Sequence, residues 1–512
     1  MEPTAEPRSG ERWLGALFLA LALLYVVPFW IVHYLPTADG PCHTYNAWIL
    51  RHYGDVQRYP LFQQYYRINA EPYPNWLGHG LMALLMFVVP PLVAEKLVVS
   101  AYALTLLAGV WYLTGAVRPG GSRWLAFLAF PFVFNYTFQF GFYNYSLSLA
   151  LFPFVLGLWW RYRERPASLR YAVGINLLLG LCYFAHILSF GLALLAIAAL
   201  WLATLRRDAW RRHLLHVAVL APQAILPVWY FARQGGEVLP SYWPLARQVR
   251  YFAGLGAIPV FGTAQEWLAG LLAVTFLALL LFTLQAEGYR RAPGTERAFL
   301  LLATLFTLLF FVSPEGMSGG TILKPRLCLY PYLILIPWLA PPVSPRMRRL
   351  GVAALALVAL LDLAYVSHRY LQLSSRMEEY LAGLDTVAPN TRVLPLLFAR
   401  RAVVDSKVDV LSHAISYKAL ELGLVDWDNY EATYPFFPTE FRASAPPPPI
   451  TDIEGRPGHL RVAVWSRRTD YVYTWQIPPE QPIVQRLQRY FQSSVQPSSG
   501  THGGVLWTRR SN

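Results

Sequence analysis

The sequence predicts an α-helical polytopic membrane protein with about 10 to 12 membrane segments and a small α/β extracytoplasmic domain at the carboxyl end. Three observations lead to this fold class. The chain of 512 residues is 55% hydrophobic and only 14% charged, whereas a soluble chain carries about 25% charged residues. Apolar runs of about 17 to 25 residues recur, which is the length that crosses a bilayer. Short arginine clusters separate these runs, as in cytoplasmic loops of membrane proteins.

The composition excludes several classes of protein. The shortage of charge is inconsistent with a soluble enzyme or a disordered chain. The three cysteines (Cys42, Cys182 and Cys328) lie far apart, so neither a disulfide framework nor a metal knuckle is indicated. The net charge of +14 does not indicate nucleic acid as a partner, because the arginines stand between apolar runs. Only four of the 43 basic residues are lysine, a bias that favours a GC-rich bacterial genome.

The first apolar run, residues 13–35, predicts the orientation of the chain. It is too long for the core of a signal peptide, and no cleavage site follows it. We therefore expect residues 1–12 in the cytoplasm and residues 36–74 as an outer loop. Later arginine clusters mark the cytoplasmic side; they are residues 161–170, 206–212, 287–297 and 345–349.

The apolar stretches between these clusters should cross the membrane an even number of times. The expected spans are two in 124–160 with an outer tip at 134–146, two short ones in 171–205 with a tip near His186, then 214–233, 264–286, 298–313, 327–343 and 350–367. Residues 74–117 are long enough for two spans, but an odd number keeps all clusters inside. We therefore expect part of 74–91 to lie on the outer face or only part-way into it.

Residues 368–512 differ from the rest in composition, because they carry more charge and more turn residues. Alternating strands and a helix predict a small α/β domain, and the last span places it outside. The expected strands are 391–398, 460–465, 471–475 and 503–510, and the expected amphipathic helix is 482–494. The chain thus divides into a cytoplasmic terminus (1–12), a membrane domain (13–367) and an outer domain (368–512), without an internal repeat.

The segment TADGPCHTYNAW (37–48) carries the sharpest chemical signal. Asp39, His43 and Asn46 are spaced so that a helix places them on one face. Asp39 could act as a general base toward a hydroxyl or an amine, and with His43 it could hold one edge of a metal site. Asp39 before Gly40-Pro41 could equally be a helix cap. All of these alternatives stay open from sequence alone.

Other polar residues fall at the predicted outer ends of spans, where ionisable groups are often functional. Asn144 lies in the aromatic tip, which could also be an interfacial belt. His186 stands alone among apolar residues, as a ligand-binding or a core histidine. Glu315, Lys324 and Arg326 belong to a glycine-bearing loop (313–326). Its cations could bind a phosphate or meet lipid headgroups.

In layout the chain resembles the GT-C membrane glycosyltransferases, which include protein O-mannosyltransferases and bacterial aminoarabinose transferases of lipid A. The resemblance covers residues 13–345 and rests on Asp39 at the head of the first outer loop, on the tip 134–146 and on Lys324 and Arg326. It implies that Asp39 is the catalytic base and that the late-loop cations hold a polyprenyl phosphate. The sequence departs from the family in having one acid where two often stand, and amides in place of an acid in the tip.

The resemblance implies an inverting glycosyltransferase in a bacterial inner membrane, with its carboxyl-terminal domain outside. Its donor would be a sugar on a polyprenyl phosphate, and its acceptor a lipid, a glycan or a protein. Substrate-binding residues would be His43, Asn46, Asn144, His186, Glu315, Lys324 and Arg326. A divalent metal ion is left open, and no nucleotide cofactor or nucleic acid is expected. Two alternatives remain: a transporter or flippase of a lipid-linked substrate, and a non-catalytic membrane-anchored assembly protein.

Overall fold

A computed structural model describes residues 9–119, 123–233, 240–286, 297–316, 322–399, 405–494 and 503–510. The chain divides into two compact units. Unit 1 consists of residues 1–30, 100–138 and 145–367, and unit 2 of residues 31–99, 139–144 and 368–512. The division into residues 1–12, 13–367 and 368–512 stays a prediction.

Unit 1 is built from helices. They are α1 (Ser9–Leu24), α2 (Val27–Trp30), η1 (Arg123–Phe132), α9 (Leu169–Ala185), α10 (Ile187–Ala203), η2 (Arg207–Ala209), α11 (Trp210–Leu220), η3 (Ala221–Ala224), α12 (Ile225–Arg233), α13 (Leu245–Ala253), α14 (Gly262–Gln285), α16 (Arg297–Val312) and α17 (Leu323–Leu335). Four further helices have residues in both units: α6 (Pro91–Val117), α7 (Tyr136–Gln139), α8 (Tyr143–Tyr162) and α18 (Pro345–Ala382).

The described helices confirm a polytopic membrane protein. Five helical stretches are long and apolar enough to cross a bilayer: Arg12–Trp30, Pro91–Val117, Arg207–Arg233, Gly262–Gln285 and Pro345–Ala382. Three shorter apolar helices are α9, α10 and α16. The chain is therefore an integral membrane protein. The number of crossings and the side on which each loop lies stay predictions.

Two of the expected spans have a different form in the structure. Residues 123–132 make a ten-residue 3-10 helix, η1, which rises only about 20 Å and is too short for a bilayer core of about 30 Å. The expectation of two full spans in 124–160 is therefore wrong for its first half. The predicted span 327–343 is helix α17, which begins at Leu323 and ends at Leu335, shortly before Pro337. Residues 74–117 contain one helix long enough to span a membrane, α6, as expected. The other helix in this stretch, Leu77–Leu85, has only nine residues.

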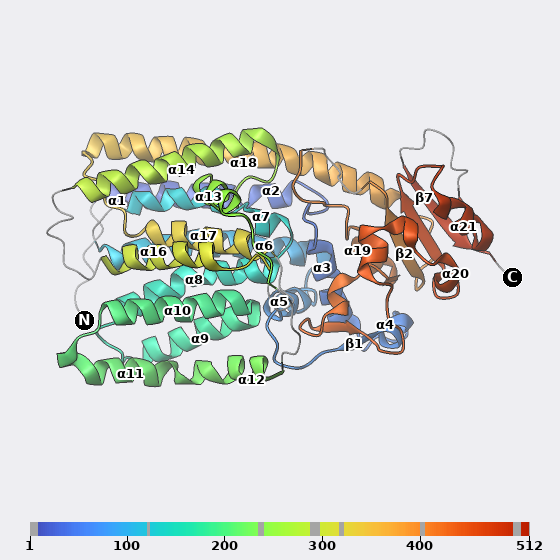
Figure 1. Ribbon diagram of the computed structural model, residues 1–512, viewed down its shortest axis with the longest axis horizontal. Coiled ribbons are helices and arrows are strands. Elements are labelled where there is room, and N and C mark those ends of the chain that lie inside the picture. Colours follow the sequence, from blue (N-terminus) through green and yellow to red (C-terminus); the bar gives the residue numbers. More distant parts are fainter. Residues whose placement is uncertain are drawn as a thin grey trace. The chain divides into compact units, whose positions relative to one another are not determined.

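Helices α9, α10, α16 and α17 of unit 1 lie side by side with nearly parallel axes (Figure 1). The predicted hairpin tip at His186 is confirmed, since α9 ends and α10 begins there. Buried hydroxyl groups connect the packed helices: Ser148 of α8 donates to Ser189 of α10 over 2.5 Å, and Ser189 is 2.7 Å from the hydroxyl of Tyr330 in α17. Hydrogen bonds between apolar helices fix their register where hydrophobic packing alone would not.

Unit 2 contains two small sheets. A two-stranded sheet pairs β1 (Tyr66–Ile68) with β4 (Thr439–Phe441). The five-stranded sheet has the order β3-β2-β5-β7-β6, with β2 parallel to β3 and β5 and the other pairs antiparallel. Its strands are β2 (Arg392–Leu397), β3 (Val425–Asp426), β5 (Tyr471–Trp475), β6 (Phe491–Ser493) and β7 (Gly504–Arg509). The helices of this unit are α3 (Gly40–His52), α4 (Pro60–Tyr65), α5 (Leu77–Leu85), α19 (Ile415–Leu422), η4 (Tyr430–Thr433), η5 (Thr451–Gly455), η6 (Pro457–His459), α20 (Val462–Trp465) and α21 (Pro482–Tyr490).

The α/β character expected for residues 368–512 is confirmed, with one wrong strand. Strands β2, β5 and β7 match three of the four expected strands, and α21 occupies the expected amphipathic helix up to Tyr490. Residues 491–493 form strand β6 instead of its last turn. The segment 460–465 contains helix α20 rather than a strand. Val462 and Trp465 are buried whereas Val464 is half exposed, a three-residue spacing that suits a helical face.

Candidate functional site

Asp39 stands immediately before helix α3, whose first turn contains Pro41, a residue suited to a helix start. The carboxylate makes no capping hydrogen bond to the helix. Instead, Oδ2 accepts a hydrogen bond of 2.8 Å from the hydroxyl of Tyr430, and only 4% of Asp39 is exposed. Burying a carboxylate is unfavourable unless hydrogen bonds or opposite charges compensate it. Helix capping therefore does not account for Asp39.

Residues 139–141, from the aromatic tip, lie against the backbone of Asp39. The amide of Asp39 donates to the carbonyl of Phe140 over 3.0 Å. Gly141 has a φ of +95°, and a Cβ there would stand 2.6 Å from the amide nitrogens of Asp39 and Gly40. A glycine is needed at this place because any side chain would push Asp39 away.

We expect Gly141→Ala to lower the thermal unfolding midpoint of the detergent-solubilised protein by several degrees. Placing a non-glycine residue at positive φ costs about 1–2 kcal/mol, and the backbone clash adds to it. Gly180→Ala is the matched control, because this glycine lies inside α9 with no atom within 4 Å of a built Cβ. The control should unfold at the wild-type temperature or above it. Equal midpoints for both variants would contradict the close approach.

His413 lies among three carboxylates, which we call the His413 cluster. Its Nε2 is 3.7 Å from Asp39 Oδ1 and 3.6 Å from Glu454 Oε1, and its Nδ1 is 3.5 Å from Asp428 Oδ2. Burial raises the pKa of Asp39 to about 7, although His413 and Tyr430 act in the opposite direction. Burial lowers the pKa of His413, but Cys42 and Asp428 outweigh it and raise that pKa well above its ordinary value. A carboxyl that titrates near neutrality is suited to accept a proton.

A second group of buried side chains, the His–His–Glu cluster, contains His43 of α3, His79 of α5 and Glu431 of η4. His43 Nδ1 is 2.5 Å from Glu431 Oε1, and His79 Nε2 is 2.9 Å from Oε2. The two ring nitrogens are 3.2 Å apart. Three residues that are distant in sequence thus bring two imidazole nitrogens and a carboxylate close together.

Asn46 connects this cluster to the following segment. Its Nδ2 donates to Glu431 Oε2 over 2.7 Å and to the side chain of Asn429 over 2.9 Å. Burial alone would raise the pKa of Glu431, but His43 and His79 outweigh it and hold that pKa below its ordinary range. The carboxylate is therefore ionised. His43 and Asn46, expected on one helical face, both reach the same glutamate.

Asn144 holds the start of α5. Its Oδ1 accepts the backbone N–H of Gly78 over 2.6 Å, and its Nδ2 donates to the carbonyl of Asn75 over 3.0 Å. His79 Nδ1 is 3.0 Å from the same carbonyl. Asn144 Nδ2 is also 3.2 Å from His79 Nδ1, so Asn144 orients the histidine directly.

Two groups among the described residues could hold a metal ion: His43, His79 and Glu431, and His413, Asp428 and Glu454. Two imidazole nitrogens and a carboxylate are a donor set that Zn²⁺ takes in proteins. In the second group, His413 turns Nδ1 to Asp428 but Nε2 to Glu454, so the two carboxylates do not share one ring nitrogen. The His–His–Glu cluster therefore fits a metal ion better.

The four remaining predicted residues belong to unit 1. His186 caps α10, where its Nδ1 accepts the backbone N–H of Leu188 over 3.1 Å. A neutral ring then carries its hydrogen on Nε2, and this Nε2 is 3.4 Å from Arg326 Nη1. Tyr145 contacts both: its ring lies 5.5 Å from that of His186 and 5.3 Å from the guanidinium. Two donors that face each other suit a shared anion.

Lys324 and Glu315 make different contacts. Lys324 is fully buried, and its ammonium donates to Gln248 Oε1 over 2.8 Å and to the carbonyl of Phe310. Glu315 accepts the backbone N–H of Lys324 over 3.1 Å, at the start of α17. Both contacts hold α17 in place. The middle of the predicted loop, residues 317–321, lies outside the described residues, as does most of the arginine cluster 287–297.

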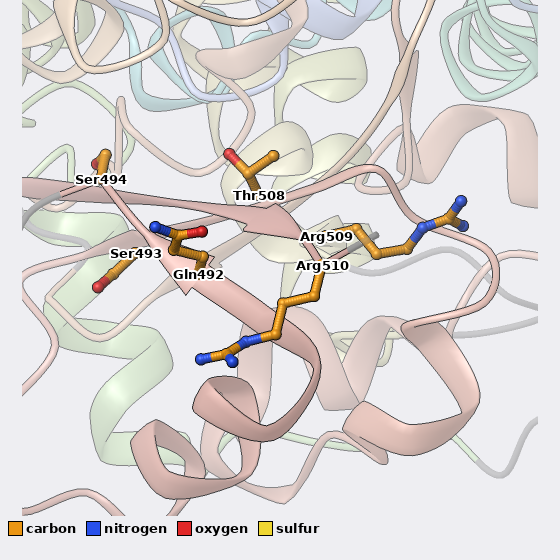
Figure 2. A pocket seen from close by; sticks show the side chains of 6 residues that line it. All are labelled: Gln492, Ser493, Ser494, Thr508, Arg509 and Arg510. Atoms are coloured by element: carbon orange, nitrogen blue, oxygen red, sulfur yellow. The ribbon is translucent and has the colours of Figure 1, made fainter. Parts of the chain in front are cut away.

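Unit 2 also has a polar pocket at the edge of the five-stranded sheet (Figure 2). It is lined by Gln492, Ser493, Ser494, Thr508, Arg509 and Arg510. Figure 2 shows the guanidinium groups of Arg509 and Arg510 pointing apart, so they do not converge on one anion. None of the residues of the two clusters lines it.

Sequence reasoning missed His79, His413, Tyr430 and Glu431. The run DWDNYE (426–431) is rich in acids and amides and follows the apolar residues Leu424 and Val425, which was a usable signal. His79 between two glycines in a largely apolar segment gave a weaker one. The roles of all eight predicted site residues in substrate binding or catalysis stay predictions.

Comparisons with known proteins support the fold. No protein-family model and no curated protein matches the chain. Among solved structures, it is similar to ArnT from Cupriavidus metallidurans bound to undecaprenyl phosphate, with a TM-score of 0.59 and 13% identity over 97% of each chain. For the apo state of ArnT the TM-score is 0.53, with 12% identity over 98% of each chain. The arabinofuranosyltransferase AftD from mycobacteria is also similar, with a TM-score of 0.53 and 16% identity. The match covers 98% of this chain and 42% of the AftD chain. These similarities show that the chain has the same overall fold as ArnT, which agrees with the fold that the resemblance implied.

Proposed function

We propose that the protein is a membrane glycosyltransferase. It moves a sugar from a polyprenyl phosphate to a lipid, glycan or protein acceptor on the outer face of a bacterial inner membrane, with residues 368–512 on that face. The observation that carries this proposal is Asp39, a buried carboxylate that does not cap its helix and contacts Tyr430 and His413. Undecaprenyl phosphate in the ArnT structure supports the donor class. No observation on the described residues favours a transporter or an assembly protein.

The reaction is a direct displacement at the anomeric carbon. Asp39 takes the proton from the hydroxyl or amine of the acceptor while that atom forms the new bond to the sugar. The bond between the anomeric carbon and the phosphate oxygen breaks, and the polyprenyl phosphate leaves with the electron pair. One displacement inverts the configuration at that carbon. A base with a pKa of about 7 is well matched to this task near neutral pH.

Arg326 and His186 are the proposed ligands of the donor phosphate. The guanidinium and the Nε2–H of the imidazole are both donors and stand 3.4 Å apart. An arginine can make two parallel hydrogen bonds to a phosphate, and such charge-assisted bonds are stronger than neutral ones. Lys324 is proposed to stabilise α17 instead, because its ammonium is buried against protein acceptors. This changes the role expected for Lys324.

A divalent metal ion belongs to the proposal. His43, His79 and Glu431 would hold it, and it would supply a positive charge that joins three segments of unit 2. No step of the displacement depends on it. Asn46 and Asn144 would orient its ligands through the hydrogen bonds described above.

The proposal is tested with purified protein in lipid. Wild type should release undecaprenyl phosphate from at least one member of a panel of radiolabelled undecaprenyl-phosphate sugars. Arg326→Ala should weaken binding of undecaprenyl phosphate about tenfold to a hundredfold, because a charge-assisted hydrogen bond contributes about 1.5–3 kcal/mol. Lys324→Ala should instead lower the unfolding temperature and keep the affinity.

Two results would count against this assignment. If wild type turns over none of the donors, the transporter and assembly-protein hypotheses would be favoured over the enzyme hypothesis. Unchanged affinity in Arg326→Ala, or a loss confined to Lys324→Ala, would mean that the His186–Arg326 pair does not bind the phosphate.

A further inference from the structure

We propose that an aromatic surface beside Asp39 binds a neutral sugar ring of the acceptor. The surface consists of the side chains of Tyr430, Tyr434, Phe436 and Phe437, which we call the aromatic platform. All four residues belong to unit 2. The inference rests on the proposed function and narrows its acceptor to a molecule that presents an uncharged sugar.

The four rings form one continuous surface. Tyr434 stacks on Phe436 with ring centroids 5.3 Å apart, and Phe436 contacts Phe437 at 5.2 Å. The ring of Tyr430 contacts those of Tyr434 and Phe437 at 6.5 and 6.4 Å. Tyr434 is 37% exposed, and the other three side chains are partly exposed. Apolar side chains that gather at a surface mark interaction sites, whereas scattered ones do not.

The backbone holds these rings in place without a ligand. Pro435 and Pro438 restrict the segment, because proline fixes φ. The buried side chain of Asn69 donates from Nδ2 to the carbonyls of Pro435 and Phe437 over 2.6 and 3.3 Å. The backbone N–H of Asn69 donates to the carbonyl of Pro438 over 2.8 Å, and strand β4 begins at the next residue and pairs with β1. Rings that are fixed in advance lose little conformational entropy on binding.

The chemistry around the platform suits a sugar ring. The faces of such a ring carry C–H groups, which lie flat on an aromatic face, and its edge carries hydroxyls that need hydrogen-bond acceptors. Carboxylates stand next to the platform, since the hydroxyl of Tyr430 donates to Asp39 over 2.8 Å. The ring of Tyr430 also lies 4.7 Å from that of His413, which contacts Asp428 and Glu454. A sugar on the platform therefore has a hydroxyl beside the proposed base, as an acceptor requires.

The same carboxylates disfavour the bilayer surface as the partner. Aromatic residues also gather at membrane interfaces. Here, however, the phosphates of lipid headgroups would meet Asp39, Asp428 and Glu454, three carboxylates around one histidine. That repulsion disfavours an acidic sugar for the same reason. A neutral sugar meets no such repulsion and uses the carboxylates as acceptors.

Saturation-transfer NMR on the full chain in nanodiscs tests the platform without any donor. The probes are methyl glycosides of neutral hexoses and pentoses, with methyl glucuronide as the anionic comparison. Wild type should transfer saturation to the C–H protons of at least one neutral glycoside and not to methyl glucuronide. Tyr434→Ala and Phe436→Ala should each weaken that binding about twofold to tenfold, the usual contribution of one aromatic contact.

Two controls accompany these variants. Tyr434→Phe should bind like wild type, because the ring and not the hydroxyl contacts the sugar. Tyr490→Ala should also bind like wild type, since Tyr490 is 38% exposed at the end of α21 and is not part of the platform. Equal binding by Tyr434→Ala, Phe436→Ala and wild type would overturn the proposal, as would the absence of binding by every neutral glycoside.

Two further measurements separate the acceptor sugar from other occupants. A fluorophore attached to Phe436→Cys should not be quenched by nitroxide-labelled lipid, and the native cysteines are buried and do not compete for the label. Quenching would place the platform in the bilayer and overturn the proposal. An undecaprenyl-phosphate sugar should not displace the methyl glycoside; displacement would assign the rings to the donor and overturn it too. Binding is measured without transfer, so inactivity toward every donor leaves this test intact, and transfer without platform binding contradicts this inference alone.

Discussion

Asp39→Asn is expected to transfer sugar about a hundredfold to ten-thousandfold more slowly than wild type, because that is the usual contribution of a general base. Asparagine has nearly the same volume, and its carbonyl oxygen can still accept the hydrogen bond from Tyr430. The substitution therefore removes the charge and little else. Transfer is measured as release of undecaprenyl phosphate by the purified protein.

The control for this variant is Asp55→Asn. Asp55 belongs to the same first loop but is exposed, so its substitution should leave transfer unchanged. Both variants should unfold near the wild-type temperature, which separates lost chemistry from lost structure. If Asp39→Asn transfers sugar at the wild-type rate, Asp39 is not the base. The hypothesis that the protein is a glycosyltransferase would then lack its proposed catalytic residue.

Local sequence patterns predicted much of the fold because they act over short distances. The α9–α10 hairpin follows from two apolar runs on either side of His186, and β2, β5 and β7 follow from short apolar segments between turns. The six-residue segment 460–465 was misassigned, since a short apolar run fits a helix as well as a strand. The helix η1 could not be anticipated from hydrophobicity, which does not distinguish a 3-10 helix from an α-helix.

The site was only half predictable for a related reason. Asp39, His43 and Asn46 lie on one helix, so their spacing alone places them together. Glu431 is 352 positions from His79, and no periodicity connects residues so far apart. Tyr430 and His413 reach Asp39 in the same way, through the tertiary structure of unit 2. Buried polar groups need partners, but sequence does not say which.

The rate of transfer should rise with pH up to about 7 and then level off. Burial raises the pKa of Asp39 to about 7, and the base acts only in its ionised form. Below that pKa the ionised fraction falls about tenfold per pH unit, so kcat/KM at pH 5 should be about a hundredfold lower than the plateau. Unfolding midpoints measured at each pH show whether the protein stays folded over this range.

Tyr430→Phe tests whether this titration belongs to Asp39. The hydroxyl of Tyr430 donates to Asp39 Oδ2 over 2.8 Å, which stabilises the ionised form and lowers its pKa. Without that hydrogen bond, Asp39 should ionise at a higher pH, and the whole profile should move in the same direction. Tyr434→Phe, which changes a more exposed tyrosine four residues later, should leave the profile in place. A wild-type rate that is flat between pH 5 and 8, or a shift to lower pH in Tyr430→Phe, would exclude Asp39 as the titrating base.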